Sequence, residues 1–311
     1  MKKFLLIIVF LILFLTVGAA VVGRIVLQTL VESDEFRERL ARNLTRASHG
    51  FVSKSIVDVS SLKVVGLFSV ESGAINIRST DKSDHVVTVT SAKVTPKLLS
   101  ILSLGPIQFD AELKMQPTGT VTVSGKVPLS LFTRKPKEDS AVEISGDIIG
   151  INAVELADLM QTAQGDPYFR LSEGTINGSF RYEKPIGKNE ASGEKTGQLN
   201  MMLSAAKWTI PSEKKIVPIE ALPVELKLKD FVINFAKPIT LKDESGTATL
   251  SGAINLPKYA EQEKSWDIRA EVVGSSGLLL VVTKLFKCPS PPAAYAFTVT
   301  GPFADSKCLG L

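Results

Sequence analysis

The chain of 311 residues is poor in the side chains that carry metal or nucleophilic chemistry, since it has only two histidines and two cysteines. A cluster of His and Cys metal ligands is therefore excluded. A histidine-dependent active site would have to use His49 or His85, and both stand in polar surroundings typical of solvated side chains. Phosphate-binding glycine loops, paired-cysteine motifs and the Gly-x-Ser-x-Gly nucleophile motif are also missing. We therefore expect no enzyme activity, no catalytic residues, no metal and no cofactor.

A strong charge imbalance is missing too. Lys and Arg number 36 against 32 for Asp and Glu, so the net charge is +4. Nucleic-acid binding needs a clustered basic face, so no nucleic-acid partner is expected. Hydrophobic residues make up 44% of the chain and the mean hydropathy is +0.18. These values exclude a largely disordered protein and point to a membrane segment.

The N-terminus carries that segment. Phe4 to Val22 is an uncharged run of 19 residues that follows Lys2 and Lys3. At about 1.5 Å per residue a helical run spans about 28 Å, close to the thickness of the bilayer core. By the positive-inside rule, residues 1–23 form a cytoplasmic tail and an uncleaved transmembrane anchor. A cleaved signal peptide, the alternative, has a shorter apolar region. The predicted location is a bacterial inner membrane, single-pass, with the bulk of the chain in the periplasm.

Beyond the anchor the hydrophobic pattern changes twice. Residues 24–50 have apolar positions at helical spacing and form a predicted juxtamembrane helix, in which Ser33 caps a second segment. Residues 51–311 alternate apolar and polar side chains, which is typical of strands with one apolar face. The fold class is therefore mainly β: a curved antiparallel sheet, half-pipe or sandwich-like, with a few short helices. Helices are predicted to start at Pro96 and Asn152, while residues 278–286 could be helix or strand.

A short motif recurs in the strands: an apolar–x–apolar triplet followed by a small polar residue and Gly. It occurs at Val121–Gly125, Val142–Gly146, Ala248–Gly252 and Phe297–Gly301. An isolated Gly inside a strand marks a bulge or bend, so repeated copies would curl a long sheet.

Two groups of residues are candidate sites. Strand 106–116 presents Ile107, Phe109, Ala111, Leu113 and Met115 on one face, and strand 223–230 presents Val224, Leu226 and Leu228. These faces either meet in a closed core or line an open apolar groove. Cys288 and Cys308 are 20 residues apart and form either a disulfide, as an oxidising compartment favours, or two free thiols.

Several segments resemble a known group of proteins. The strand and Pro-started turn of Val94–Leu102, the next strand at Ile107–Leu113, the Val121–Gly125 motif and the ending Phe297–Lys307 are similar to the AsmA-like envelope proteins. More narrowly they resemble the type II secretion system protein N (GspN) family. The resemblance implies a non-enzymatic, inner-membrane-anchored accessory component of a type II secretion system. Its partners would be inner-membrane lipid and other secretion-system subunits. The alternative is an AsmA-like lipid-binding or lipid-transfer protein of the cell envelope with a phospholipid ligand.

Overall fold

The computed structural model describes most of the chain beyond the N-terminal run. The described residues are 24–48, 55–79, 86–97, 100, 105–128, 140–155, 170–186, 194–210, 215–244, 246–256, 264–274, 276–286, 288, 296–302 and 306–310. The predicted anchor at 1–23 lies outside these residues, as do His49 and His85. Within these ranges, no helix is both long and apolar enough to cross a bilayer.

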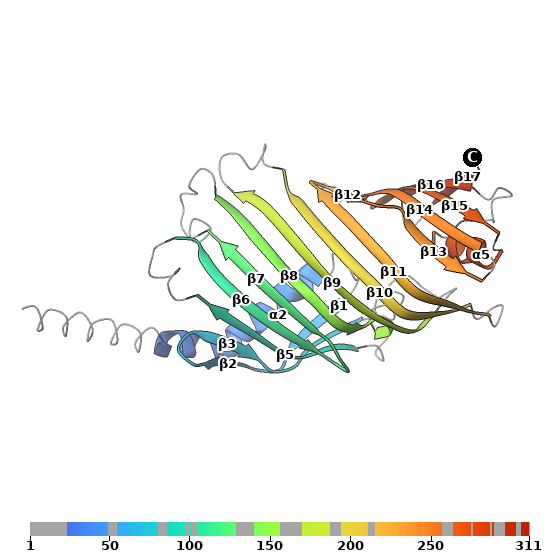
Figure 1. The fold of residues 1–311 in the computed structure, drawn as a ribbon. Helices are drawn as coiled ribbons and strands as arrows, with labels where there is room; N and C mark the ends of the chain where they lie inside the picture. The colour runs from blue at the N-terminus through green and yellow to red at the C-terminus, as the bar shows by residue number, and fades with distance from the viewer. Residues whose placement is uncertain are drawn as a thin grey trace, which may run out of the picture.

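The described chain is mainly β and forms one large, open, antiparallel sheet that twists along its length (Figure 1). The first strands are β1 (Ser55–Val59), β2 (Leu62–Val65), β3 (Ser69–Ser72), β4 (Ile75–Ser79), β5 (Val86–Pro96), β6 (Ile107–Met115), β7 (Thr120–Val127) and β8 (Ser140–Asn152). The remaining strands are β9 (Arg170–Ile186), β10 (Thr196–Ile210), β11 (Lys215–Lys229), β12 (Val232–Phe235), β13 (Ile239–Asp243), β14 (Gly246–Asn255), β15 (Ser265–Val273), β16 (Ala296–Pro302) and β17 (Lys307–Gly310).

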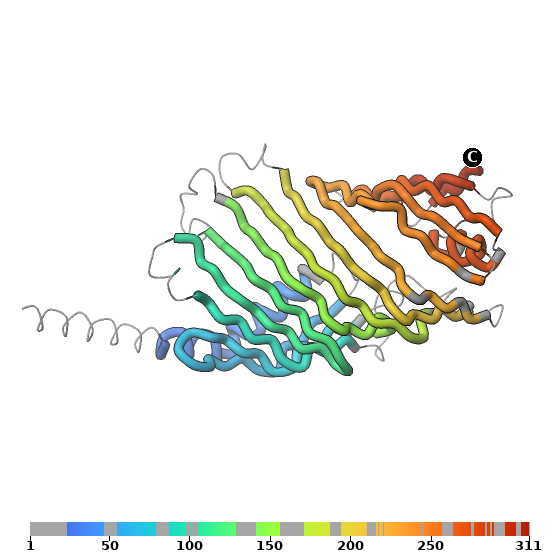
Figure 2. Tube along the Cα trace, in the orientation of Figure 1, coloured from blue at the N-terminus to red at the C-terminus, as the bar shows by residue number. Residues whose placement is uncertain are grey.

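The sheet is a meander in which strands pair with their neighbours in the sequence. β3 and β4 both pair with β5, and β5 to β11 then follow one another in order. β11 pairs with β12, β12 and β13 pair with β14, and β14 to β17 continue in order. Figure 2 shows the resulting run of long diagonal strands in the middle of the molecule. The sandwich-like alternative is wrong, because the strands form a single sheet.

A helix covers the N-terminal end of the sheet. Residues 24–31 are helical and α2 (Asp34–Ser48) follows them. The Phe36 amide donates to Ser33 Oγ at 3.3 Å, as expected for an N-cap. Apolar side chains of the two segments pack on β1 to β4, around buried Val31, Val59 and Leu62.

The same helical region also covers the free edge formed by β1 and β2. The Val57 amide donates to Thr45 Oγ1 at 3.0 Å, and the Val64 amide donates to Glu32 Oε1 at 3.2 Å. Backbone groups on an open sheet edge are a template for pairing with another chain. These two bonds occupy amides that would otherwise be available on that edge.

A second helix closes the C-terminal end. The stretch 278–286, which could be helix or strand, is helical up to Leu285 and belongs to α5 (Ser276–Leu285). The helix packs against β13, β14 and β15 and buries Val281 and Val282 there. Phe297 and Val299 of β16 are also fully buried in this cluster. This end of the sheet therefore has a closed hydrophobic core.

Two predicted helix starts had different outcomes. Pro96 is the last residue of β5 and pairs with Phe109, so the predicted helix does not start there. Ser100 is helical, and the rest of that segment lies outside the described residues. Asn152 does cap a helical turn, since its Oδ1 accepts from the Val154 amide at 2.9 Å. That turn is helical over residues 153–155, and the rest of the predicted helix lies outside the described residues.

Candidate functional site

The central strands carry one continuous apolar face. Along β6, side chains alternate between partly buried and exposed. Residues directly opposite in an antiparallel pair share a face, so the strand register shows which side chains lie together. One row crosses from Phe109 to Gly125, Ile144, Tyr182, Gly197 and Leu228. A second row crosses from Ala111 to Val123, Gly146, Phe180, Leu199 and Leu226.

We call this face of β6 to β11 the apolar strip. Its side chains are Ile107, Phe109, Ala111, Leu113, Met115, Val121, Val123, Ile144, Ile148, Phe180, Tyr182, Leu199, Met201, Val224, Leu226 and Leu228.

Every member of the apolar strip is partly buried, and none is fully buried. Full burial begins beyond it, at Val89 of β5, at Ile151 near the end of β8, at Ile186 at the end of β9 and at Leu222 of β11. Among the described elements, α2 packs mainly on β1, and α5 packs on β13 to β15. The strip lies between these two covered ends. No described element packs as a second layer on the central strands, and the closed core and the open groove at strands 106–116 and 223–230 both stay predictions.

Glycines of the recurring motif make room for aromatic rings on this face. A Cβ added at Gly125 would overlap the ring of Phe109, which lies across the backbone of the neighbouring strand. At Gly146 it would overlap the Phe180 ring and the Thr122 carbonyl oxygen. The strand register is unbroken at the motif glycines, so the β-bulges predicted there are wrong. Gly252 and Gly301 have φ of 128° and 93°, a region that favours glycine.

The predicted groove residues lie on the same face but not in contact. Ile107, Phe109, Leu113 and Met115 belong to β6, and Val224, Leu226 and Leu228 belong to β11. Four strands, β7 to β10, separate the two sets. Those strands supply the apolar side chains that the sequence reasoning missed, such as Ile144, Phe180 and Met201. Apolar and polar side chains alternate in these strands as well, but glycines on the apolar face interrupt the pattern.

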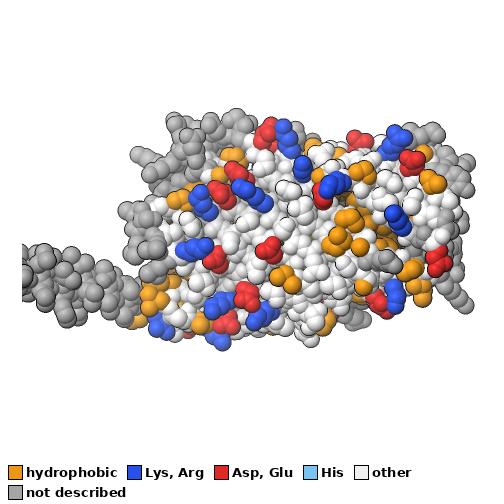
Figure 3. Space-filling model, viewed as in Figure 1, with side chains coloured by type: hydrophobic (Ala, Val, Ile, Leu, Met, Phe, Trp, Pro, Cys, Tyr) orange, Lys and Arg blue, Asp and Glu red, His pale blue; other side chains and the backbone are white. Residues whose placement is uncertain are grey.

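The opposite face of the central strands is polar. Lys126 Nζ lies 2.9 Å from Glu143 Oε1, and Lys97 Nζ lies 3.3 Å from Asp110 Oδ1. A depression of about 400 Å³ on this face is lined by Lys97, Lys126, Glu143 and Arg181, among others. Figure 3 shows charges of both signs interspersed across the visible surface. Mixed, mutually paired charges are typical of a solvated face, so we assign no site to it.

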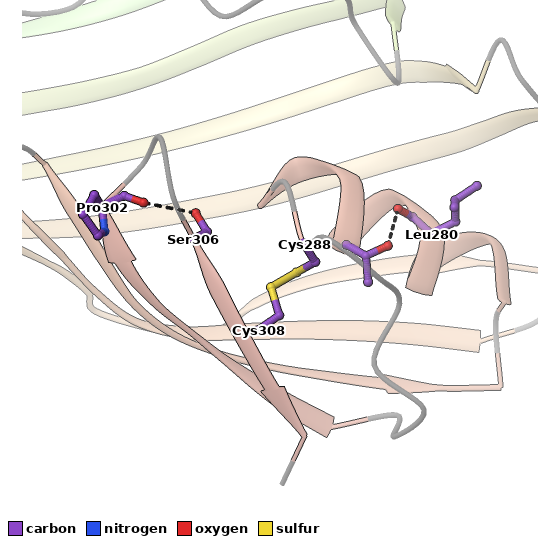
Figure 4. Close-up of a disulfide and its surroundings, with 6 residues drawn as sticks. Leu280, Cys288, Pro302, Ser306 and Cys308 are labelled. Carbon is purple, nitrogen blue, oxygen red and sulfur yellow. Dashed lines mark hydrogen bonds between the residues drawn. A yellow bond between two sulfur atoms is a disulfide. The ribbon is translucent and has the colours of Figure 1, made fainter.

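A disulfide joins Cys288 to Cys308, with 5.6 Å between the Cα atoms (Figure 4). Cys288 follows α5, and Cys308 lies on β17, the last strand of the sheet. Nearby, Ser306 Oγ donates to the Pro302 carbonyl at 3.3 Å. The bond therefore ties the helix that closes the C-terminal core to the final strand.

Comparison with known protein families, with curated proteins and with solved structures found no match. In the part of the chain that the structure describes, no three His, Cys, Asp or Glu side chains are grouped so that they could hold a metal ion. The apolar strip is thus the candidate functional site.

Proposed function

We propose that the chain is a non-enzymatic lipid-binding protein of the cell envelope, in which the sheet acts as a half-pipe and the apolar strip holds acyl chains. One observation carries this proposal. Sixteen side chains of one sheet face, continuous over six strands, are only partly buried in the folded chain. A contiguous apolar surface that stays in contact with water marks an interaction site.

The dimensions suit an acyl chain. Strands lie about 4.8 Å apart, so a strip of six strands is about 24 Å wide. An acyl chain of one leaflet spans about half of the roughly 30 Å hydrocarbon core. Each methylene group that leaves water for the strip contributes about 0.8 kcal/mol, so a full chain would be held by its length rather than by any single contact.

The apolar strip favours the lipid-binding alternative over the secretion-system role. A scaffold needs its apolar faces covered by protein, whereas a lipid carrier needs them open. The accessory role in type II secretion, the inner-membrane anchor and the periplasmic location remain predictions from the sequence. A lipid ligand is compatible with all three, because an anchor at residues 1–23 would hold the strip close to a bilayer.

Two adjacent methionines provide a matched test. Met201 belongs to the strip and lies opposite Val224, while Met202 is 38% exposed on the polar face and lies opposite Pro223. Met201→Glu puts a carboxylate where acyl chains would lie, and Met202→Glu makes the same change on the solvated face. We expect native mass spectrometry of the full-length, detergent-purified chain to find co-purified phospholipid in the wild type and in Met202→Glu. Met201→Glu should lose most of it.

Circular dichroism of both variants checks that each is folded. Equal lipid occupancy in the two variants would contradict the proposal. It would mean that the lipid binds elsewhere, for example at the anchor, where neither substitution has an effect. A wild type that carries no lipid and takes none up from phospholipid micelles would also contradict it.

A further inference from the structure

One end of the apolar strip carries two lysines and a tyrosine on the apolar face. Strand alternation in β9 places Lys184 on the same face as Tyr182, and the register places it opposite Val142. Lys195 stands one residue before β10. Its backbone continues the ladder, since the Asp230 amide donates to the Lys195 carbonyl at 2.7 Å and the Lys195 amide donates to Asp230 Oδ1 at 3.0 Å.

The two lysines lie at the same end of the β9–β10 pair. The register ends with Tyr182 opposite Gly197 and Glu183 opposite Thr196, and continuing it by one residue would place Lys184 opposite Lys195. Both lysines are partly buried, so their stems lie along the apolar surface and their ammonium groups reach its rim. Like charges directly opposite one another destabilise a strand pair. An anion between them would relieve that repulsion.

Neither ammonium has an ion-pair partner among the described residues. Lys195 Nζ lies 4.4 Å from the centre of the Phe231 ring, a cation–π contact. The neighbouring Glu194 is already paired, with Lys229 at 3.1 Å. On the polar face, Lys126 and Lys207 are in ion pairs, whereas the exposed Lys227 is in none that the structure describes.

We infer that Lys184, Lys195 and the Tyr182 hydroxyl form a head-group site that binds the phosphate of a phospholipid whose acyl chains lie on the apolar strip. This inference rests on the proposed function and specifies its ligand. A phosphate offers several acceptor oxygens, and charge-assisted hydrogen bonds from lysines to them are among the stronger polar contacts. The tyrosine adds a neutral donor beside the first acyl carbons.

The test compares lipids that share acyl chains but differ in the head group. Full-length protein is equilibrated in detergent micelles with equal amounts of phosphatidylglycerol and diacylglycerol, and bound lipid is identified by native mass spectrometry. We expect the wild type to prefer phosphatidylglycerol. The double variant Lys184→Gln/Lys195→Gln should lose about tenfold in that preference while still binding diacylglycerol. Tyr182→Phe should lose less.

Lys227→Gln is the control. Lys227 is an exposed polar-face lysine of β11 that lies opposite Gln198 at the same end of the sheet, and its loss should leave the preference unchanged. An unchanged preference in the double variant overturns the head-group site while leaving the acyl-binding strip intact. Binding of neither lipid overturns the proposed function itself. Added inorganic phosphate or oleate that displaces the phospholipid equally well would show that the site takes a free anion, which also contradicts the inference.

Discussion

The C-terminal end and the middle of the sheet have similar strand patterns but different surroundings. In β15, side chains alternate strictly, and Ile268, Ala270 and Val272 have at most 1% of their surface exposed. In β6, Phe109, Ala111 and Leu113 alternate just as strictly and are only partly buried. α5 covers the first group, and no described helix packs on the second.

The comparison shows that alternation alone determines which side chains share a face, but not what covers that face. A strand pattern predicts an apolar surface equally well whether a helix, a second sheet or a ligand lies on it. The covering element must be found separately. In this chain α5 is a ten-residue helix far along the sequence from β6, and it covers only strands near itself.

The largest expected difference between the two regions comes from introducing a charge. Leu250→Glu places a carboxylate in the closed core, where Leu250 is 5% exposed. A buried charge without a partner should cost about 4 kcal/mol or more, enough to unfold a marginal protein. Leu113→Glu and Leu226→Glu place the same charge on the strip, where it can reach water, and should cost about 1 kcal/mol while lipid capture falls. Urea denaturation with a phospholipid co-purification assay measures both effects.

Equal destabilisation by Leu250→Glu and Leu113→Glu would mean that the strip is covered after all. Lys114→Glu is the control for β6, because Lys114 is exposed on the polar face next to Leu113.

The disulfide should contribute an intermediate effect that is confined to the closed end. The bond closes a loop of about 20 residues, for which chain entropy predicts about 3 kcal/mol. Cys288→Ala/Cys308→Ala should therefore lower the free energy of unfolding by about that amount. Hydrogen exchange should report faster opening of β16, β17 and α5 and unchanged protection in β6 to β9. Uniform loss of protection along the sheet would show that its two regions unfold as one unit.

The smallest effect concerns the strip's tyrosine. Burial raises the pKa of the Tyr182 phenol above its ordinary value of 10.0. The folded state therefore retains this proton at a pH where the unfolded state has lost it. The stability that results is present below pH 10 and declines as the pH rises above 10. The alkaline absorbance titration of the wild type minus that of Tyr182→Phe gives the titration of the Tyr182 phenol. We expect its midpoint above pH 10. A midpoint at or below pH 10 would mean that the phenol is solvated.

Much of this architecture follows from the sequence. The period-two pattern predicted a mainly β, antiparallel sheet, and the Ser33 cap and the Asn152 cap were predicted from their side chains. Glu183 and Lys184 give no apolar signal, yet both pair in β9, because backbone pairing does not require apolar side chains.

The candidate site was only half predictable. Both outer strands of the strip, β6 and β11, have uninterrupted alternation and were recognised. The four strands between them contain Gly125, Gly146, Gly178 and Gly197 on the apolar face, and these positions read as gaps in a hydropathy pattern. Only the structure shows that two of them accommodate neighbouring aromatic rings.

The meander topology bears on how such a sheet can be assembled. From β5 to β11 each strand pairs with the one just before it in the sequence, so no pairing closes a connection longer than the 17 residues between β8 and β9. Short loops carry a small closure entropy, and a low average separation between contacting residues accompanies fast folding. A chain emerging N-terminus first can therefore add one strand at a time to an edge that already exists. The growing edge moves away from the end that α2 has capped and reaches β17, which the disulfide ties to the residue following α5.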